Sequence, residues 1–243
     1  MKTLPLTSGL LLTALLVGPA NAATTFGSVS LLAQVTVNAG GTPSLGSDTA
    51  VSFDLTELPL QAAVNRSDQG PDSSASASAD LSTDFASASA GAFIFESIFA
   101  TYAGSPGTVG GASALGTAQY RFFVSTSTIA TINYSLLFEG NTGASTIRIS
   151  QANEDVFRIN PTSSGSLVTA AFGPGDYDLF VSIAGSAGSS TDDASASRAG
   201  RVAFSFADAG VPEPATWAMM IGGMGAAGVA LRRRKANVSV RYA

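Results

Sequence analysis

Few side chains of this sequence can take part in acid–base or nucleophilic chemistry. The 243 residues include no histidine and no cysteine, which removes the commonest general base, the commonest transition-metal ligand and the thiolate nucleophile. Serines are abundant, but a serine without histidine needs a lysine as its base, and no lysine lies between the two ends of the chain. The glycine patterns of hydrolase elbows, P-loops and dinucleotide sites do not occur. We therefore expect a protein that is not an enzyme and needs no cofactor.

Two pairs of aspartates are the remaining candidates for chemistry. Asp176 and Asp178 share one face of a predicted strand start, and Asp192 and Asp193 are adjacent in a later segment rich in glycine and serine. Paired carboxylates can hydrolyse a glycosidic bond, and hard oxygen ligands suit Ca²⁺ outside the cell. The spacing matches no EF-hand or nonapeptide calcium motif, so solvated loop residues are the simpler interpretation. A carboxylate-dependent hydrolase and a calcium site at Asp176 and Asp178 stay as alternatives.

Acidic side chains dominate the central part of the chain. All 17 aspartates and glutamates lie between Asp48 and Glu213, where the basic residues are six arginines, so this stretch has a net charge of −11. Such a surface repels nucleic acid and anionic headgroups, and we expect neither as a partner. The other basic residues lie at the two ends of the chain.

Alternation of apolar and polar residues predicts strands over most of the region from Thr24 to Ala207. Two segments with apolar residues on both faces, AFIFESIFATYA and AQYRFFVSTS, are predicted as central strands. Turns rich in glycine and proline separate the strands, and the pattern predicts no amphipathic helix there. About ten short strands of this kind indicate an all-β fold, an antiparallel β-sandwich of jelly-roll or immunoglobulin-like type.

Three segments allow more local predictions. Serine and alanine alternate over 73–91, which fits either two strands or a flexible linker, and the regular alternation favours strands. The segment 185–201 is predicted to be a long loop between the last two strands. Tyr177 follows a Pro-Gly turn at the start of a strand, a position that corner tyrosines often take in such sandwiches.

Carbohydrate binding needs exposed aromatic rings, and the central region has no tryptophan. At least two of its four tyrosines fall on apolar strand faces, where packing in the core is the expected role. A carbohydrate-binding module is therefore the alternative to a structural or adhesive protein. The four tyrosines are Tyr102, Tyr120, Tyr134 and Tyr177.

The N-terminus has the three parts of a secretory signal peptide. Lys2 supplies the positive charge, residues 4–17 are apolar, and Ala20 and Ala22 are the small residues that precede a cleavage site. We expect a signal helix in residues 1–22, cleavage after Ala22 and export of the protein. An uncleaved anchor and a buried helix are the alternatives.

The C-terminus also has three parts. Pro212, Glu213 and Pro214 form a short segment that proline holds extended. The 17 residues 215–231 carry no charge and would span about 26 Å as a helix, near the lower limit for a bilayer core. A basic cluster follows at once. It predicts a single transmembrane helix that leaves the β-strand region before it (residues 23–207, called the body below) outside the cytoplasm. The cluster consists of Arg232, Arg233, Arg234 and Lys235.

The order of these parts resembles the PEP-CTERM sorting signal of Gram-negative bacteria. The resemblance lies in Pro212-Glu213-Pro214, in Trp217-Ala218-Met219, in the apolar helix rich in glycine and alanine, and in the basic cluster. It implies that a membrane-embedded exosortase recognises the tail and cuts near the Pro-Glu-Pro motif. The body would then be released or transferred toward an extracellular polysaccharide matrix. In one respect the chain differs from the family pattern, because ANVSVRYA follows the basic cluster.

Together these patterns predict an exported protein of the cell envelope or extracellular matrix. Its expected partners are the exosortase, the inner membrane before cleavage, and exopolysaccharide. The body would be in the periplasm while the tail anchors it, and at the outer surface or outside the cell afterwards. The predicted organisation is a signal peptide (1–22), a β-sandwich domain (23–207), a linker (208–214), a transmembrane helix (215–231) and a basic cytoplasmic tail (232–243).

Overall fold

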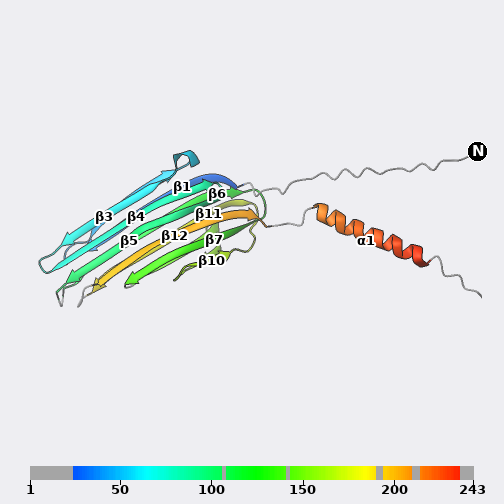
Figure 1. The fold of residues 1–243 in the computed structure, drawn as a ribbon. Coiled ribbons are helices and arrows are strands. Elements are labelled where there is room, and N and C mark those ends of the chain that lie inside the picture. Colours follow the sequence, from blue (N-terminus) through cyan, green and yellow to red (C-terminus); the bar gives the residue numbers. More distant parts are fainter. Residues whose placement is uncertain (1–23, 106–107, 141–142, 190–193, 210–213, 236–243) are drawn as a thin grey trace, which may run out of the picture.

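The computed structural model describes residues 24–105, 108–140, 143–189, 194–209 and 214–235, which form two β-sheets and a C-terminal helix (Figure 1). The first sheet consists of β1 (Thr24–Asn38), β2 (Ser44–Ser52), β6 (Gly110–Val124), β8 (Gly143–Gln151), β9 (Glu154–Ile159) and β11 (Gly175–Ser189). The second consists of β3 (Gln61–Gln69), β4 (Ser73–Ser87), β5 (Ala90–Gly104), β7 (Thr128–Gly140), β10 (Gly165–Val168) and β12 (Ala194–Asp208). A single 3₁₀ turn, η1 (Leu55–Glu57), follows β2, and the helix is α1 (Pro214–Lys235).

Both sheets have six strands, and all their pairings are antiparallel. The order is β2-β1-β6-β11-β8-β9 in the first sheet and β10-β7-β12-β5-β4-β3 in the second. The predicted all-β fold of antiparallel sheets is therefore confirmed. The described part has more strands than a seven-stranded immunoglobulin constant domain or an eight-stranded jelly roll. The predicted signal helix in 1–22 lies outside the described residues.

The strands are longer than the sequence pattern predicted. Six of them, including β5 and β6, span 15 residues each. β5 lies between β12 and β4, and β6 lies between β1 and β11, so the prediction that these two apolar segments are central strands is confirmed. In β5 the inward positions change parity, from Phe93 and Phe95 to Ile98 and Ala100, where its pairing with β4 and β12 shifts register. A register irregularity of this kind adds a residue to one strand, so the apolar residues of β5 depart from strict alternation.

Small residues form strands at one place where the sequence allowed a strand or a linker, and at another where it predicted a loop. Serine and alanine over 73–87 form β4, with Ala75, Ala77 and Ala79 buried on its inner face, which confirms the strand alternative. The predicted loop at 185–201 is wrong, because β11 continues to Ser189 and β12 begins at Ala194. Alanines 194 and 196 face inward there and pack against β5. Alanine and serine differ little in hydrophobicity, so the alternation that predicts a strand is weak in these segments. Their short side chains nevertheless fit well between the two sheets.

The core changes character along the strands. Near the end where β1 begins and β12 ends, aromatic rings fill the space between the sheets, with Phe204 contacting Phe85, Phe93, Tyr120 and Phe206 at centroid distances of 5.3 to 5.9 Å. Near the opposite end alanines predominate among the buried residues, and Tyr102 is the large ring there. The aromatic end therefore provides most of the large apolar side chains that hold the sheets together.

Two buried tyrosines anchor loops to this aromatic core. Tyr177 donates a hydrogen bond from its hydroxyl to the carbonyl of Gly173, 2.8 Å away and four residues earlier, so the prediction of a corner tyrosine is confirmed. Tyr120 donates to the carbonyl of Ala88 at 2.6 Å. Burial raises the pKa of both Tyr120 and Tyr177, because removal from water penalises the charged phenolate.

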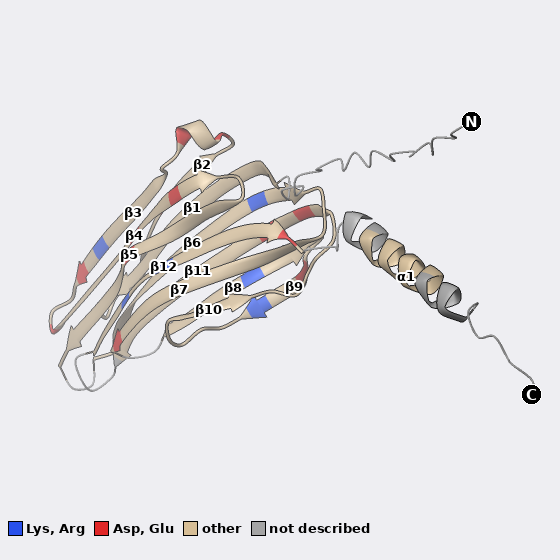
Figure 2. Ribbon diagram, turned by 45° about the vertical axis from the view of Figure 1, so that its right-hand side comes forward, with Lys and Arg blue, Asp and Glu red and all other residues tan. Residues whose placement is uncertain are grey.

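The two long edges of the sandwich differ. At the edge formed by β2 and β3, side chains bridge the sheets: Asp48 accepts a hydrogen bond from the backbone nitrogen of Ala63 at 3.0 Å, and Asp68 accepts one from Ala39 at 2.9 Å. At the other edge, formed by β9 and β10, residues 160–164 connect one sheet to the other. Figure 2 shows how sparsely charged residues occur on both sheets.

We predict that Phe204→Ala lowers the free energy of unfolding by about 3–5 kcal/mol, because it removes a buried ring and leaves a cavity among four other rings. Urea denaturation, monitored by circular dichroism and not by tryptophan fluorescence, measures the change. Leu137→Ala is the matched control, since Leu137 is 70% exposed, and it should change stability by less than about 0.5 kcal/mol. Equal effects of the two substitutions would contradict this assignment of the core.

We also predict that the protein loses stability as the pH rises above about 10. The raised pKa means that Tyr120 stays neutral when folded, whereas in the unfolded chain it ionises near its reference value of about 10. Stability from this residue is therefore complete below that pH and is lost above it. Urea titrations at several alkaline pH values give the free energy of unfolding at each pH. This free energy should fall less steeply with pH for Tyr120→Phe than for the unaltered protein, and identical slopes would show that Tyr120 does not contribute.

Candidate functional site

The predicted sorting residues lie at the C-terminal helix. α1 begins at Pro214, as expected for a proline at the first helical position, where its missing N–H costs nothing. Trp217, Ala218 and Met219 belong to the first turns of the helix, and Arg232, Arg233, Arg234 and Lys235 form its last turn. Pro212 and Glu213 lie outside the described residues, as do Ala20 and Ala22 of the predicted signal cleavage site.

The middle of α1 presents apolar side chains that pack against nothing in the sandwich. All residues from Met219 to Val229 are exposed, with Met219 at 79% and Met224 at 71%. Exposed apolar surface of this extent normally meets another apolar surface. Among the described helices, none meets the length and hydropathy that a membrane span requires.

Asp176 and Asp178 do share one face of β11, as the alternation predicted, and both point away from the core. The carboxylate of Asp178 accepts hydrogen bonds from Arg121 Nε at 3.0 Å and from Gln119 Nε2 at 2.9 Å. Asp176 is exposed beside Phe123 of β6. Over the described residues no three acidic, histidine or cysteine side chains gather as metal ligands, and Asp192 and Asp193 lie outside those residues.

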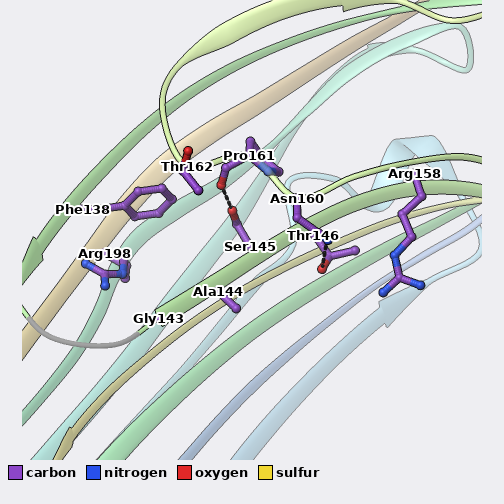
Figure 3. A pocket seen from close by; sticks show the side chains of 10 residues that line it. All are labelled: Phe138, Gly143, Ala144, Ser145, Thr146, Arg158, Asn160, Pro161, Thr162 and Arg198. Atoms are coloured by element: carbon purple, nitrogen blue, oxygen red, sulfur yellow. Dashed lines mark hydrogen bonds between the residues drawn. The ribbon is translucent and has the colours of Figure 1, made fainter.

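A cavity of about 390 Å³ lies at the edge of the sandwich where the 160–164 connection crosses between the sheets (Figure 3). Its walls come from β7, β8, β9, β12 and that connection. Two of the lining side chains are arginines, and none is acidic. The lining consists of Phe138, Gly143, Ala144, Ser145, Thr146, Arg158, Asn160, Pro161, Thr162 and Arg198.

Arg198 is a buried cation at this cavity, only 5% exposed. It continues the inward face of β12 after Ala194 and Ala196, just before the strand pairing shifts at Gly200. Its Nη1 donates to the backbone carbonyls of Glu139 at 2.9 Å and Ser197 at 3.1 Å. The guanidinium carbon lies 4.9 Å from the centre of the Phe138 ring. Stacking and the two carbonyl contacts hold the guanidinium in one orientation.

The opposite wall carries polar side chains from β8, β9 and the connection. Thr146 donates to the Asn160 side-chain oxygen at 3.0 Å, and the buried Ser145 hydroxyl donates to the Pro161 carbonyl. Arg158 reaches the cavity from β9 and forms an ion pair of 3.3 Å with Asp155. Its side chain is 54% exposed, so this pair adds little to stability.

Nothing in the sequence singled out this cavity. Arg198 was placed in a predicted loop, and Arg158 and Phe138 are 20 residues apart in different strands. One signal was present: an arginine stands in the alternating pattern ASASRAGR at a position that the buried alanines 194 and 196 share. A charged residue at an inward position indicates either a functional site or a partner group that pairs with the charge.

Calcium at millimolar concentration should leave the melting temperature unchanged, and Asp178→Asn should lower the free energy of unfolding by no more than about 1 kcal/mol, as for other partly exposed ion pairs. The reason is that Arg121 and Gln119 already occupy the Asp178 carboxylate. Differential scanning fluorimetry with and without calcium measures the melting temperature, and urea denaturation measures the free energy of unfolding. A calcium-dependent rise that Asp178→Asn removes would instead establish the calcium site.

Comparison with known proteins gives one match. Residues 210–235 match the family model described as the PEP-CTERM protein-sorting motif. None of the curated proteins and none of the solved structures compared with the chain is similar to it. The match covers the segment that includes Pro212-Glu213-Pro214, α1 and the basic cluster. The chain therefore carries a C-terminal PEP-CTERM protein-sorting motif, which implies an exported protein that an exosortase processes.

Proposed function

We propose that this protein is delivered by its sorting motif to the outer envelope or the exopolysaccharide matrix, where its β-sandwich has a structural or adhesive role without enzymatic activity. The observation that carries the proposal is the matched motif at 210–235, together with a body that ends at Asp208, before the motif begins. The signal peptide in 1–22, cut after Ala22, would bring the chain to the export machinery.

In this proposal α1 holds the protein at the inner membrane for a limited time. The 17 uncharged residues 215–231 enter the bilayer, and Arg232 to Lys235 stop on the cytoplasmic side. Support comes from the exposed apolar side chains of α1, which need a partner other than the sandwich. The exosortase then cuts near Pro212-Glu213-Pro214, where the two prolines keep the backbone extended.

The geometry of the body suits an anchor at one end. Thr24 pairs with Val124, and Asp208 pairs with Thr128, so the chain enters and leaves the sandwich at the same end, as Figure 1 also shows. Strands of 15 residues extend about 50 Å from that end. Removal of the tail would leave both sheets intact, because no described strand includes a residue after Asp208.

A non-enzymatic role agrees with the chemistry of the described residues. Three of the four tyrosines of the body are buried, Tyr102 at 2%, Tyr120 at 0% and Tyr177 at 4% exposure, so they serve the core as expected. The carboxylate of Asp178 is held by Arg121 and Gln119, which argues against its use as a hydrolytic nucleophile or base. The arginine-lined cavity favours the second candidate function, a carbohydrate-binding module.

We predict that intact-mass measurement of envelope and medium fractions detects a chain that starts at Ala23 and has lost the residues after about Val211. Substitutions Pro212→Ala, Glu213→Ala and Pro214→Ala, made together, should leave the tail in place, because they remove the extended motif that the exosortase is proposed to grip. Thr216→Ala, a nearby change outside the motif, serves as the control and should be processed normally. If the full tail with Arg232 to Lys235 persists in every fraction of the unaltered protein, the helix is a permanent anchor and the proposed sorting fails.

A further inference from the structure

We propose that the outer face of the first sheet, where Arg148 of β8 lies beside Arg158 of β9, binds a carboxylate-bearing sugar unit of an acidic polysaccharide. The inference rests on the proposed matrix role for its setting, and it names the ligand class that the sandwich would recognise there. Arg158 also borders the cavity described above, whereas Arg148 is not part of the cavity lining.

Two like charges lie directly opposite each other at this place. Arg148 and Arg158 are partners in the register of β8 with β9, and Arg148 faces away from the core because the flanking Ile147 and Ile149 are buried. Figure 2 shows the basic segments of β8 and β9 next to each other. Like charges opposite each other destabilise a sheet. In a body with only six arginines, such a pair is a favourable place for an anion.

Arg148 is held in one orientation and keeps unused donors. Its guanidinium carbon lies 4.7 Å from the centre of the Phe180 ring of β11, and stacking of this kind restricts the side chain. Nε of Arg148 is buried and has no hydrogen-bond partner among the described residues, so no protein acceptor offsets the charge there. The side chain as a whole is 39% exposed. The donors that remain for a ligand are therefore those of its Nη groups.

Asp155 shows how a carboxylate can lie between the two guanidinium groups. Its Oδ2 is 3.3 Å from Arg158 Nη1, and its Oδ1 is 3.8 Å from Arg148 Nη1. Hydrogen bonds between a guanidinium and a carboxylate are normally about 2.7–2.9 Å long, so Asp155 holds Arg158 loosely and is too far from Arg148 for a hydrogen bond. One carboxylate beside two arginines also leaves one positive charge for a ligand.

The other carboxylate close to Phe180 is already bound. Asp178 accepts hydrogen bonds from Arg121 and Gln119 of β6, so the charge of Arg121 offsets it. Asp176 and Glu154 lie three or four residues along their strands from the row of Arg148, which is about 10–13 Å, and salt screens charges at that distance. The excess positive charge of this face therefore lies at the Arg148–Arg158 pair.

Neutral neighbours favour a sugar over a simple anion. Thr146 of β8 and Ser182 of β11 lie opposite each other one row along from Arg148 and carry hydroxyls on the same face. Thr146 donates to the Asn160 side-chain oxygen, so the Asn160 amide NH₂ group stays available as a donor. Hydroxyls and an amide next to two guanidinium groups match a sugar ring that carries both hydroxyls and a carboxylate. Sheet faces bind oligosaccharides in other all-β folds.

Strand pairing argues against an acidic peptide as the ligand. Peptides commonly bind by adding a strand to a free sheet edge. β11, which carries Phe180, is paired with β6 on one side and β8 on the other, and β8 is paired with both β11 and β9 at Arg148. The backbone groups beside the site are therefore already used, and recognition depends on side chains.

The test uses the full chain purified in a neutral detergent and isothermal titration calorimetry with tetragalacturonate at about 0.15 M salt, where a Debye length of about 8 Å suppresses long-range attraction. Its methyl ester is the matched probe, because it has the same sugar backbone without the charge. We expect tetragalacturonate to bind at least about tenfold more tightly than the ester, since hydrogen bonds between charged groups contribute that factor or more. Tetraglutamate, an acidic peptide without the sugar hydroxyls, should bind at least about tenfold more weakly than tetragalacturonate.

Loss of either arginine connects the binding to this face. Arg148→Gln and Arg158→Gln should each weaken tetragalacturonate binding about tenfold. Arg201→Gln is the control with the same loss of charge, since Arg201 pairs with Asp84 at 2.7 Å in the second sheet, and it should bind as the unaltered protein does. Circular dichroism checks that each variant is folded. If Arg148→Gln fails to fold, Arg158→Gln decides, because the Arg158 side chain is 54% exposed.

A gain of affinity separates ligand binding from a structural role of these charges. Asp155→Asn removes the carboxylate that competes with the ligand, and it should tighten tetragalacturonate binding about twofold to fivefold, as expected for the loss of a partly exposed ion pair. Asp84→Asn is the matched control, because it makes the same change of charge beside Arg201, and it should leave the affinity unchanged. Arginines that serve only to pair with Asp155 would give no gain.

Any one of four results would overturn the inference. They are no binding of tetragalacturonate, equal binding of its ester or of tetraglutamate, equal weakening by Arg201→Gln and Arg158→Gln, and equal affinities of Asp155→Asn and Asp84→Asn. None of these results bears on tail processing, which is measured by the mass of the exported chain. The ligand inference and the proposed sorting can therefore fail separately.

Discussion

Contact between the inner faces of two six-stranded sheets holds this molecule together. No cysteine is present to link the sheets, so the free energy that keeps them together comes mainly from buried apolar side chains, with side-chain hydrogen bonds between the sheets such as the one that Asp48 accepts from Ala63. Most of the large side chains gather at one end, around Phe204 and Tyr120. Alanines predominate among the buried residues of the other end, where the alternation of serine and alanine favours a strand for β4 and the beginning of β12 is predicted as a loop.

The aromatic end is also the end where the chain enters and leaves the sandwich. Thr24 and Asp208 lie beside the connection between β6 and β7, and Thr126 of that connection donates to the Asp208 side chain at 2.5 Å. The best-packed part of the core thus lies closest to the segment that leads into the sorting motif. A cut beyond Asp208 would leave this packing unchanged, which fits the proposed processing of the tail.

The two sheets are joined differently at the two long edges of the sandwich, and the cavity lies at only one of these edges. Asp48 and Asp68 bridge the sheets at the β2–β3 edge, and carboxylates at that edge satisfy backbone N–H groups that would otherwise be open to pairing. At the β9–β10 edge the 160–164 connection crosses instead, and the cavity forms behind it with Arg198 at its inner wall. Carboxylates thus bridge the sheets at one edge, whereas two arginines line the cavity at the other.

The sequence by itself determined the class of fold and the sorting motif. Alternation over β1, β7 and β11 depends only on neighbouring residues, and so does the order of Pro212-Glu213-Pro214, apolar stretch and basic cluster. Only the tertiary structure decided that the start of β12 is a strand, because Ala194 and Ala196 gain their burial from the facing sheet and carry little signal of their own. For β4 it confirmed the strand that the alternation of serine and alanine favours. It also decided the cavity, since Phe138 and Arg198 lie opposite each other through the pairing of β7 with β12, and Arg158 lines the cavity from the other sheet. Such long-range contacts leave no pattern in the local sequence.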